Sequence, residues 1–563
     1  MQKNIKIFIL TVLSAIIGMG CSDEFLKGTQ KGTLSDESLQ NETGVDLLLT
    51  AAYSILDGSV DGQNRERSGD NWWIDVLTDE AHKGSTNGDQ AILHDLQTYS
   101  NWSTSNNYFF LKWEGLYAGV NRCNAVINLA NSITDVDLTQ KIAEARFLRG
   151  HFNFELTRIW RNVPYIDEIA TIENPDVANN GPLWDEIEAD FQFAITNLPE
   201  DLGPGRANSW AAKAYMGKVH LYQEEWTNAE TILDDVINNG PYDLNAEFVD
   251  NFNGAGKNGI EVVFSIQHEA NDGATNNGNG NKGGELNFPG GGPYGSCCGF
   301  YQPTQDLANA FKTTGGLPQP NTYNNSDIDN DYGVASADPF TPYAGELDPR
   351  IDYTVGRRGI DYNGWGEHVG FDWVRAQADA GPYLPKKNTY KAGEDNTRGT
   401  AGWGQQVPGL HYNVIRFADV LLMAAEAKAE LGDAAGAMAL VNRVRQRAID
   451  MTTVKDVANP TNDAANYSIA LYTATDFTAA NAVELVRFER KLELAMEGHR
   501  YFDLTRWGIL PEVMNEFFTN EVRTVSTLVT GTVQDRHEVF PIPLRAIDVA
   551  ENLTQNPEWS AAQ

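Results

Sequence analysis

The sequence predicts a mostly α-helical protein with paired helices as its scaffold, a loop-rich face and only minor β-structure. Three observations support this fold class. Apolar residues recur at helical spacing over long stretches, two distant segments resemble each other as helical hairpins, and a region rich in Gly, Asn and Pro lies between those hairpins. With 563 residues and 41% hydrophobic content, the chain can bury a large core.

The first residues have the layout of a secretory signal. A short basic start and an apolar run over residues 7–17 lead to small residues and then to Cys21, which stands where a bacterial lipoprotein is cleaved and acylated. We therefore expect residues 1–20 to be a signal peptide, Cys21 to carry the lipid, and residues 21–43 to form a tether. The apolar run is short for a membrane span. The alternatives are an ordinary signal peptide with an incidental Cys, or a buried N-terminal helix.

Helical spacing is strong in the first half of the chain. Between residues 113 and 130, for example, Leu116, Val120 and Ile127 fall on one face of a helix. The polar, aromatic stretch before it, residues 57–108, is expected to form loops. The helices expected in this half span residues 45–56, 113–130, 138–160 and 184–198.

Two helical hairpins share a pattern of small residues. When Leu221 is aligned with Ala429, Ala229 falls on Ala437, and small residues at such points let two helices approach closely. Pairs of this kind are typical of tetratricopeptide-like scaffolds. The helices are expected over residues 210–222 and 227–237 in the first hairpin, and over 414–431 and 434–448 in the second.

The region between the hairpins has a different composition. Residues 271–299 are rich in Gly and Asn, and residues 302–409 are rich in Pro, Asp, Tyr, Trp and Gly. A long irregular insertion in a compact domain is usually functional. Helical spacing returns over residues 483–498. We expect one domain over residues 44–563, with its helical scaffold mainly in 44–56, 113–240 and 412–510 and the loop-rich insertion at about 270–410.

Charge and cysteine content narrow the function classes. The formal net charge is −35, and such a surface repels nucleic acid and anionic membranes, because both require basic patches. Beyond Cys21 only Cys123, Cys297 and Cys298 remain, too few for a disulfide scaffold. Cys297 and Cys298 could form a vicinal disulfide, one of them could pair with Cys123, or all three could be thiols.

Several motifs stand out in the second half of the chain. They are Gly498-His499-Arg500-Tyr501-Phe502-Asp503-Leu504-Thr505-Arg506-Trp507-Gly508, residues 416–427, Leu347-Asp348-Pro349-Arg350, and Phe540-Pro541-Ile542-Pro543 with residues 552–557. Together with the start at Cys21, this ordered set resembles the SusD/RagB family of Bacteroidetes outer-membrane lipoproteins. The resemblance covers nearly the whole chain.

The resemblance implies a SusD-like glycan-binding lipoprotein on the outer face of the outer membrane, docked on a SusC-like TonB-dependent transporter. It also implies four tetratricopeptide-like helix pairs as scaffold, and a ligand site assembled from an early loop and the insertion. From the residues themselves, we expect Arg500 and Arg506 to satisfy carboxylates such as Asp503 or Glu497, and Trp507 to cap a core. These residues are expected to be structural.

A sugar-binding site needs exposed aromatic faces and polar groups that bind hydroxyls, and both are expected on loops. The alternative is that each Trp is a core residue, since tryptophan is mostly buried. Trp373 in the insertion is a weaker candidate, and tryptophans on helices, such as Trp226, are expected to pack. The candidate ligand-binding residues are Asp70, Trp72, Trp73, Asn101, Trp102, Tyr294, Tyr301 and Trp365.

Metal and enzyme signals are weak. Asp327, Asp329 and Asp331 have the oxygen spacing of a calcium loop, but Tyr332 stands where that loop requires Gly. A solvated acidic turn is the alternative, and no other cofactor is expected. The sequence contains no G-x-S-x-G nucleophile elbow, so we expect a binding protein and no catalytic residues.

The leading hypothesis is a surface protein that captures oligo- or polysaccharide for uptake. The acidic chain and the Trp-rich loops favour a neutral glucan, such as a laminarin-type β-1,3-glucan or an α-glucan. Arg357-Arg358 and Lys386-Lys387 leave an anionic glycan open. The alternatives are a secreted glycoside hydrolase and a SusD-like protein that captures peptides or glycopeptides.

Overall fold

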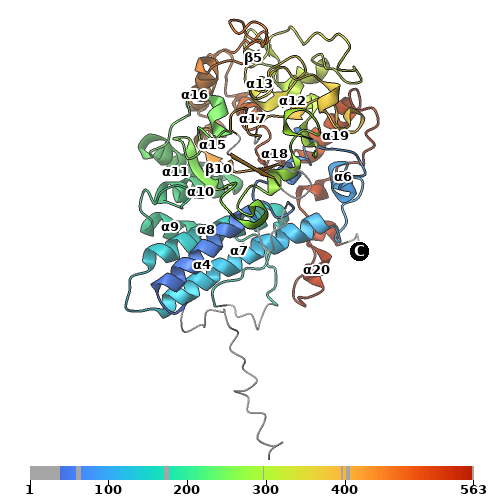
Figure 1. Cartoon of the computed structure of the whole chain (residues 1–563). Coiled ribbons are helices and arrows are strands. Elements are labelled where there is room, and N and C mark those ends of the chain that lie inside the picture. Colours follow the sequence, from blue (N-terminus) through green and yellow to red (C-terminus); the bar gives the residue numbers. More distant parts are fainter. Residues whose placement is uncertain are drawn as a thin grey trace, which may run out of the picture.

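The structure is a computed structural model, shown in Figure 1. The signal peptide, Cys21 and most of the tether expected from the sequence lie outside the described residues. The long helices stack side by side along one side of the molecule, and the short elements of the insertion lie towards its upper end (Figure 1). The described residues are 39–58, 65–169, 176–295, 297–387, 389–394, 397–400 and 406–560.

Nine helices of the described chain form the scaffold, and each packs against the next along the chain, with α17 returning onto α15. The predicted helices are present, but α7 begins six residues earlier than expected, α17 ends five residues earlier, and the start of α15 is corrected below. They are α4 (Glu42–Ser54), α7 (Asn107–Ser132), α8 (Thr139–Trp160), α9 (Trp184–Asn197), α10 (Ser209–Tyr222), α11 (Trp226–Asn239), α15 (Phe417–Glu430), α16 (Ala434–Asp450) and α17 (Ala482–Glu493).

The two predicted hairpins, α10–α11 and α15–α16, are present and pack through small residues. Ala229 and Ala437 are both fully buried. Gly217 faces Leu233, where an added Cβ would approach the leucine side chain to 2.5 Å. The start of α10 is fixed by Asn208, whose Oδ1 accepts from the Ala211 amide at 2.8 Å, a capping contact worth about 1 kcal/mol.

The β-structure consists of five two-stranded antiparallel sheets within the described residues. One of them corrects the sequence prediction, because residues 412–416 form a strand and the helix expected from 414 begins only at Phe417. The pairs are β1 (Ala81–Gly84) with β3 (Phe300–Pro303), β2 (Val262–Ile266) with β10 (Tyr412–Arg416), β4 (Thr313–Thr314) with β5 (Leu317–Pro318), β6 (Val355–Gly356) with β7 (Leu384–Pro385), and β8 (Arg398–Thr400) with β9 (Gln406–Pro408).

Short helices connect these parts. Helix α18 lies within the C-terminal motif, and α19 follows it. Helix α19 also packs against α12 of the insertion. The short helices are α5 (Trp72–Asp75), α6 (Ala91–Gln97), α12 (Gln305–Ala310), α13 (Ile351–Thr354), α14 (Gln377–Ala380), α18 (Arg500–Arg506), α19 (Leu510–Glu521) and α20 (Leu544–Ile547).

A buried charge network around α17 joins the sequence motifs. The Glu493 carboxylate lies 2.9 Å from Arg350 and 2.6 Å from Arg416, and it also pairs with Arg447. Burial raises its pKa, but the three guanidiniums together hold the pKa of Glu493 well below its usual range. Removing one partner from such a network leaves a buried charge without its counter-ion, which is strongly destabilising. The network therefore fixes the motifs relative to one another.

The same network extends to the insertion through Lys387. One ion pair predicted from the sequence, that of Arg500, is wrong. Lys387 donates to the Glu497 carboxylate at 2.6 Å and to the Ala495 carbonyl at 2.8 Å. Arg500 pairs with Asp79 at 2.8 Å, and not with Asp503 or Glu497 as expected, because the buried Asp79 of the early segment lies against it.

Two further expectations for the C-terminal motif concern Arg506 and Trp507. Arg506 does pair with Asp503, at 2.9 Å, and also with Glu426. Trp507 is only half-buried, and its indole N–H donates to Glu426 at 2.6 Å.

Candidate functional site

The early segment, residues 65–108, and the insertion meet through direct contacts. Strands β1 and β3 pair across them. Tyr301 donates its hydroxyl to Asp75 at 2.6 Å, and Asn87 donates to Asp379 at 3.1 Å. The two parts of the chain that the family resemblance assigns to a ligand site therefore do lie together.

Four of the aromatic candidates are buried, and two of them, Trp72 and Tyr301, contact each other across this join. Trp72 is 2% exposed and packs edge-on against Tyr301, which is 3% exposed. Trp73 is fully buried and donates its indole N–H to the Glu66 carbonyl at 2.9 Å. Trp102 is 7% exposed. The structure thus places all four rings in the core, where they present no face to a ligand.

Trp102 shows how this burial arises. Its ring stacks on Tyr99 with centroids 5.1 Å apart and on Trp559 at 6.1 Å, while His537 lies 5.0 Å away. Its indole N–H donates to the Leu96 carbonyl at 2.9 Å. Two of these partners, His537 and Trp559, come from the far end of the chain, so the polar neighbours of Trp102 in the sequence gave no indication of burial.

Three candidates remain from the early loop and the Gly-rich segment. Two of them are buried and hydrogen-bonded within the protein, and one is exposed. Asp70 is buried and accepts from the Ser68 hydroxyl at 2.6 Å, and burial raises its pKa. Tyr294 is 2% exposed and donates to the Tyr390 carbonyl at 2.5 Å. Asn101 is exposed, but the ring beside it points inward.

A second, smaller core supports the insertion, and two tryptophans lie at its edge. Trp365 and Trp373 are partly buried against it, and Phe371, two residues before Trp373 in the sequence, is 46% exposed. We call these three residues the aromatic rim. The buried residues of this second core, aromatic and aliphatic, are Phe288, Tyr294, Tyr362, Val374, Leu384, Tyr390 and Leu410.

The Gly-rich loop is shaped to lie against the rim. Gly292 adopts a φ of +75°, and an added Cβ would lie 2.6 Å from the ring of Trp373. Any other residue at this position would be strained in its backbone and would also clash with the indole. The predicted Gly-rich segment thus has a structural role, since it positions Trp373 without covering it with side chains.

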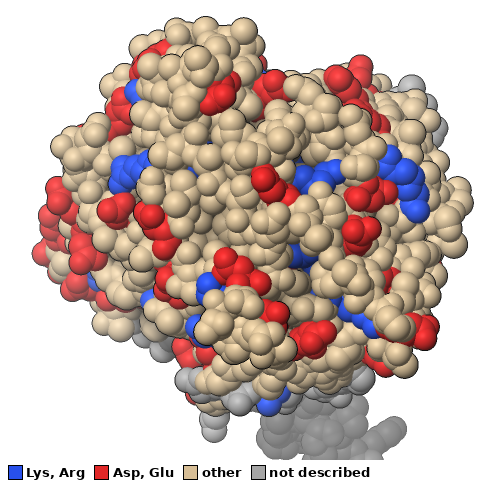
Figure 2. All heavy atoms as spheres, turned by 90° about the horizontal axis from the view of Figure 1, so that it is seen from above, with Lys and Arg blue, Asp and Glu red and all other residues tan. Residues whose placement is uncertain are grey.

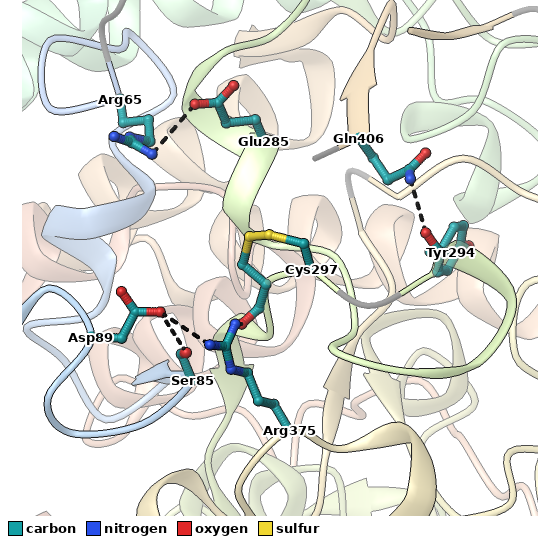
Figure 3. Close-up of a disulfide and its surroundings, with 9 residues drawn as sticks. Arg65, Ser85, Asp89, Glu285, Tyr294, Cys297, Arg375 and Gln406 are labelled. Carbon is teal, nitrogen blue, oxygen red and sulfur yellow. Dashed lines mark hydrogen bonds and ion pairs between the residues drawn. A yellow bond between two sulfur atoms is a disulfide. The ribbon is translucent and has the colours of Figure 1, made fainter. Parts of the chain in front are cut away.

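Polar side chains surround the vicinal disulfide (Figure 3). The structure joins Cys297 to Cys298, while Cys123 is a buried free thiol. Arg375, two residues after Trp373, donates to the Cys298 carbonyl at 3.2 Å and lies 3.7 Å from Asp89, as Figure 3 shows. Of the three cysteine arrangements considered from the sequence, the structure has the vicinal one.

The polar edge, which we define as Ser85, Asp89 and Arg375, is held by a buried lysine. The Lys83 ammonium donates to the carbonyls of Gly84, Thr86 and Asp89 at 3.0, 2.8 and 2.7 Å, and burial lowers its pKa to about 8. Ser85 donates to the Asp89 carboxylate at 2.9 Å. The loop is therefore fixed in place, with the carboxylate and the guanidinium of the polar edge about one-third exposed.

The rim and the polar edge together offer the chemistry of a site for a hydroxylated ligand. Aromatic faces take the apolar side of such a ligand, and a few fixed polar groups orient it. Of the residues in this candidate arrangement, the sequence indicates Trp365 and, more weakly, Trp373, and it does not indicate Phe371, Asp89 or Arg375. Nothing in the local sequence marks the last two residues, because their pairing joins segments almost 300 positions apart.

The three predicted calcium ligands do not converge. Asp327 pairs with Arg523 at 2.9 Å, Asp329 is exposed, and Asp331 is buried beside Gln377. Burial raises the pKa of Asp331. The arrangement is that of an ordinary acidic turn.

One group of possible metal ligands occurs in the described part of the chain. It consists of Glu188, His220 and Glu225, whose ligand atoms lie within 4.8 Å of one another. Hydrogen bonds already hold both carboxylates, because Gln223 donates to Glu188 at 2.6 Å and Asn228 donates to Glu225 at 3.0 Å. The group is therefore explained as a hydrogen-bonded cluster of polar side chains.

Charged side chains of both signs occur on the molecular surface. On the face seen in Figure 2, basic side chains of the described residues stand singly or in small groups among acidic ones. None of the described helices is both long and apolar enough to cross a membrane.

Two family models match the chain. One, described as the SusD family, matches residues 260–559, and the other, described as "Starch-binding associating with outer membrane", matches residues 32–221. A SusD-like protein, P25 of Formosa agariphila, is 25% identical over 97% of both chains. A SusD-like protein of Bacteroides ovatus is 26% identical over 74% of this chain and 68% of its own.

Solved structures share the fold. A SusD-like protein from Bacteroides fragilis matches with a TM-score of 0.68 at 22% identity, over 94% of this chain and 100% of the other. Surface glycan-binding protein A from Bacteroides thetaiotaomicron, solved in complex with laminarihexaose, matches with a TM-score of 0.66 at 20% identity, over 92% and 99%. A structure described as a laminarin-binding SusD-like protein gives 0.65 at 22%, with the same coverage. The predicted SusD-like, mostly helical fold is confirmed.

Proposed function

Because the chain belongs to the SusD family, we propose that it captures oligo- or polysaccharide at the cell surface and delivers it to a SusC-like TonB-dependent transporter. The observation that carries this proposal is the family match over residues 260–559, together with the alignment to P25 along nearly the full length of both chains. The second family model, whose description names starch binding and the outer membrane, supports both the ligand class and the location. The protein binds its ligand without cleaving it.

The proposed ligand site is the aromatic rim with the polar edge beside it. Trp365, Phe371 and Trp373 supply ring surface, and Arg375 and Asp89 supply a donor and an acceptor for hydroxyl groups. The disulfide and the buried lysine beneath the loop hold these groups in position, which lowers the entropy lost on binding.

The proposed ligand is a neutral glucan, either a laminarin-type β-1,3-glucan or an α-glucan. A net charge of −35 disfavours polyanionic chains. The basic residues that left an anionic glycan open are used internally. Arg357 pairs with Asp352 at 2.7 Å, and Lys386 and Lys387 donate to carbonyl or carboxylate groups of the protein. Structural neighbours with laminarin or laminarihexaose in their descriptions support the β-1,3 choice.

Location follows from the same proposal. Lipidation at Cys21 anchors the chain to the outer membrane, and the residues that follow act as a tether on its outer face. A lipid anchor is sufficient for this role, since a covalently attached pair of acyl chains holds a protein at a membrane stably.

Calorimetry of the full chain in mild detergent tests the function. Laminarihexaose and maltohexaose serve as probes, and product analysis of the same mixtures tests for cleavage. Binding of one probe without shorter products supports the proposal. Shortened sugars would favour a hydrolase, and affinity for peptides without affinity for either glucan would favour a peptide-capturing relative.

Matched tryptophan variants test the site. We expect Trp365→Ala and Trp373→Ala each to weaken binding about 5- to 150-fold, because a ring stacked on a ligand contributes about 1–3 kcal/mol in comparable contacts. Trp226→Ala is the control, since this ring is also half-buried but lies at the start of α11. Equal affinity in all three variants would exclude the aromatic rim as the site.

A further inference from the structure

A second polar cleft lies away from the aromatic rim and shares no lining residue with it. It has a volume of about 750 Å³ and is formed by α17, α19 and the loop of residues 320–325. This volume falls within the roughly 300–1,000 Å³ of typical small-molecule sites. All of its lining residues belong to the described part of the chain.

The floor of this cleft, which we call the α17–α19 cleft, is rigid. Lys491 donates to Asp306 at 2.5 Å and to the Tyr323 hydroxyl at 3.2 Å. Tyr323 in turn packs against Phe488 with centroids 5.5 Å apart. Arg500, also on the floor, is bound to Asp79. A charged floor with every partner in place cannot collapse into the cleft, so the space stays open.

The cations of the cleft are all neutralised within the protein. Besides Lys491 and Arg500, the two remaining ones are Arg523, paired with Asp327 at 2.9 Å, and Arg487, paired with Glu430 at 3.4 Å. An anionic ligand would therefore have to compete with carboxylates that are already bound.

The walls, in contrast, carry acceptors and amides that the protein leaves unused. Among the contacts of the described residues, none engages the side chains of Glu484, Glu516 or Asn520, and the same holds for two amides of the facing loop, Asn321 and Asn325. Glu484 on α17 and Glu516 on α19 are both exposed, and both line the cleft. Two carboxylates and three amides that make no hydrogen bond within the described protein are suited to a ligand rich in hydroxyl groups.

We infer that the α17–α19 cleft is a second saccharide-binding site for a neutral oligosaccharide. Hydroxyl groups donate to Glu484 and Glu516 and exchange hydrogen bonds with the asparagine amides. The partly exposed rings of Tyr323 and Trp507 line the same space and contact the apolar edges of the sugar. This inference rests on the proposed function, and it adds a second contact that would strengthen binding of long chains through avidity.

Calorimetric stoichiometry of the full chain with laminarihexaose and maltohexaose tests the inference. We expect two sites in the unchanged protein. In the Trp365→Ala/Trp373→Ala background the cleft alone remains, and there Glu484→Ala/Glu516→Ala should lower the remaining affinity about tenfold or more, because each removes a charge-assisted hydrogen bond. The control is Glu512→Ala, an exposed carboxylate one turn earlier on α19 that does not line the cleft.

The outcomes separate this inference from the function it rests on. No binding of either glucan would overturn both. One site in the unchanged protein, unaffected by Glu484→Ala/Glu516→Ala, would overturn the second site and leave glycan capture intact. Because all three altered glutamates are exposed, their melting temperatures should stay near that of the unchanged protein, so a loss of affinity reports on the cleft.

Discussion

Replacing Trp102 with Ala distinguishes a core tryptophan from a ligand-binding one. The ring lies between Tyr99 and Trp559 and donates its N–H to the Leu96 carbonyl at 2.9 Å. Truncation removes these contacts and leaves a cavity that the rigid surroundings fill only in part. Large-to-small changes of this kind cost about 3–5 kcal/mol.

The expected change in melting temperature follows from the size of the folded part. An unfolding entropy of about 2.1 cal/mol/K per residue gives roughly 1 kcal/mol/K for about 500 folded residues. A loss of 3–5 kcal/mol then lowers the melting temperature by about 3–5 °C. Since the ring presents no face to the surface, glycan affinity measured well below the melting temperature should not change.

Differential scanning calorimetry and titration calorimetry on the same preparations measure both quantities. Trp102→Phe is the control, because it keeps a ring in the stack and loses the hydrogen bond, and it should show a smaller fall in melting temperature. The reasoning would be refuted if Trp102→Ala kept the melting temperature of the unchanged protein while its affinity for laminarihexaose fell tenfold.

Three further perturbations have definite expected outcomes. Gly292→Ala should weaken glycan binding and lower stability by about 1–3 kcal/mol, through backbone strain and a clash with the indole of the rim; titration and thermal melting check this, and an unchanged variant would argue against the packing described. Burial lowers the pKa of His151 to about 4 and of His268 to about 3, so below about pH 6.5 the unfolded chain binds protons that the folded chain does not, and stability falls with decreasing pH by about 1.4 kcal/mol per unit for each histidine. Urea unfolding near pH 7 and pH 5 measures this fall, and equal midpoints would contradict it. Calcium or a chelator should leave the melting temperature unchanged, because Asp327 is already paired with an arginine; a calcium-dependent rise would restore the metal hypothesis.

The helical scaffold could be predicted from the sequence because its signals are local. Apolar spacing within each helix and small residues such as Ala229 and Ala437 at hairpin contacts are visible without knowledge of the fold. The predicted start of α15 is wrong because the local sequence does not show the pairing partner. Residues 412–416 are apolar enough to continue a helix, but pairing with β2 keeps them extended.

The candidate site was less predictable because burial in loops depends on distant partners. Trp102 and Trp365 both have polar or glycine neighbours in the sequence, yet one is covered by rings from the C-terminal segment and the other stays at an edge. Arg500 illustrates the same limit for charges. Acidic residues lie next to it in the sequence, but its partner is Asp79, more than 400 positions away.

The bond between Lys387 and the C-terminal segment has a consequence for how such proteins diversify. It ties the far end of the insertion to the scaffold, while the pairing of β1 with β3 ties its beginning. Arg350 of the buried charge network is a third anchor inside this stretch, so the residues between Arg350 and Lys387, including the rim, can vary as an exchangeable cassette while the helical frame stays constant. Grafting the corresponding segment of a relative between the same anchors is a direct route to a receptor with a different sugar preference.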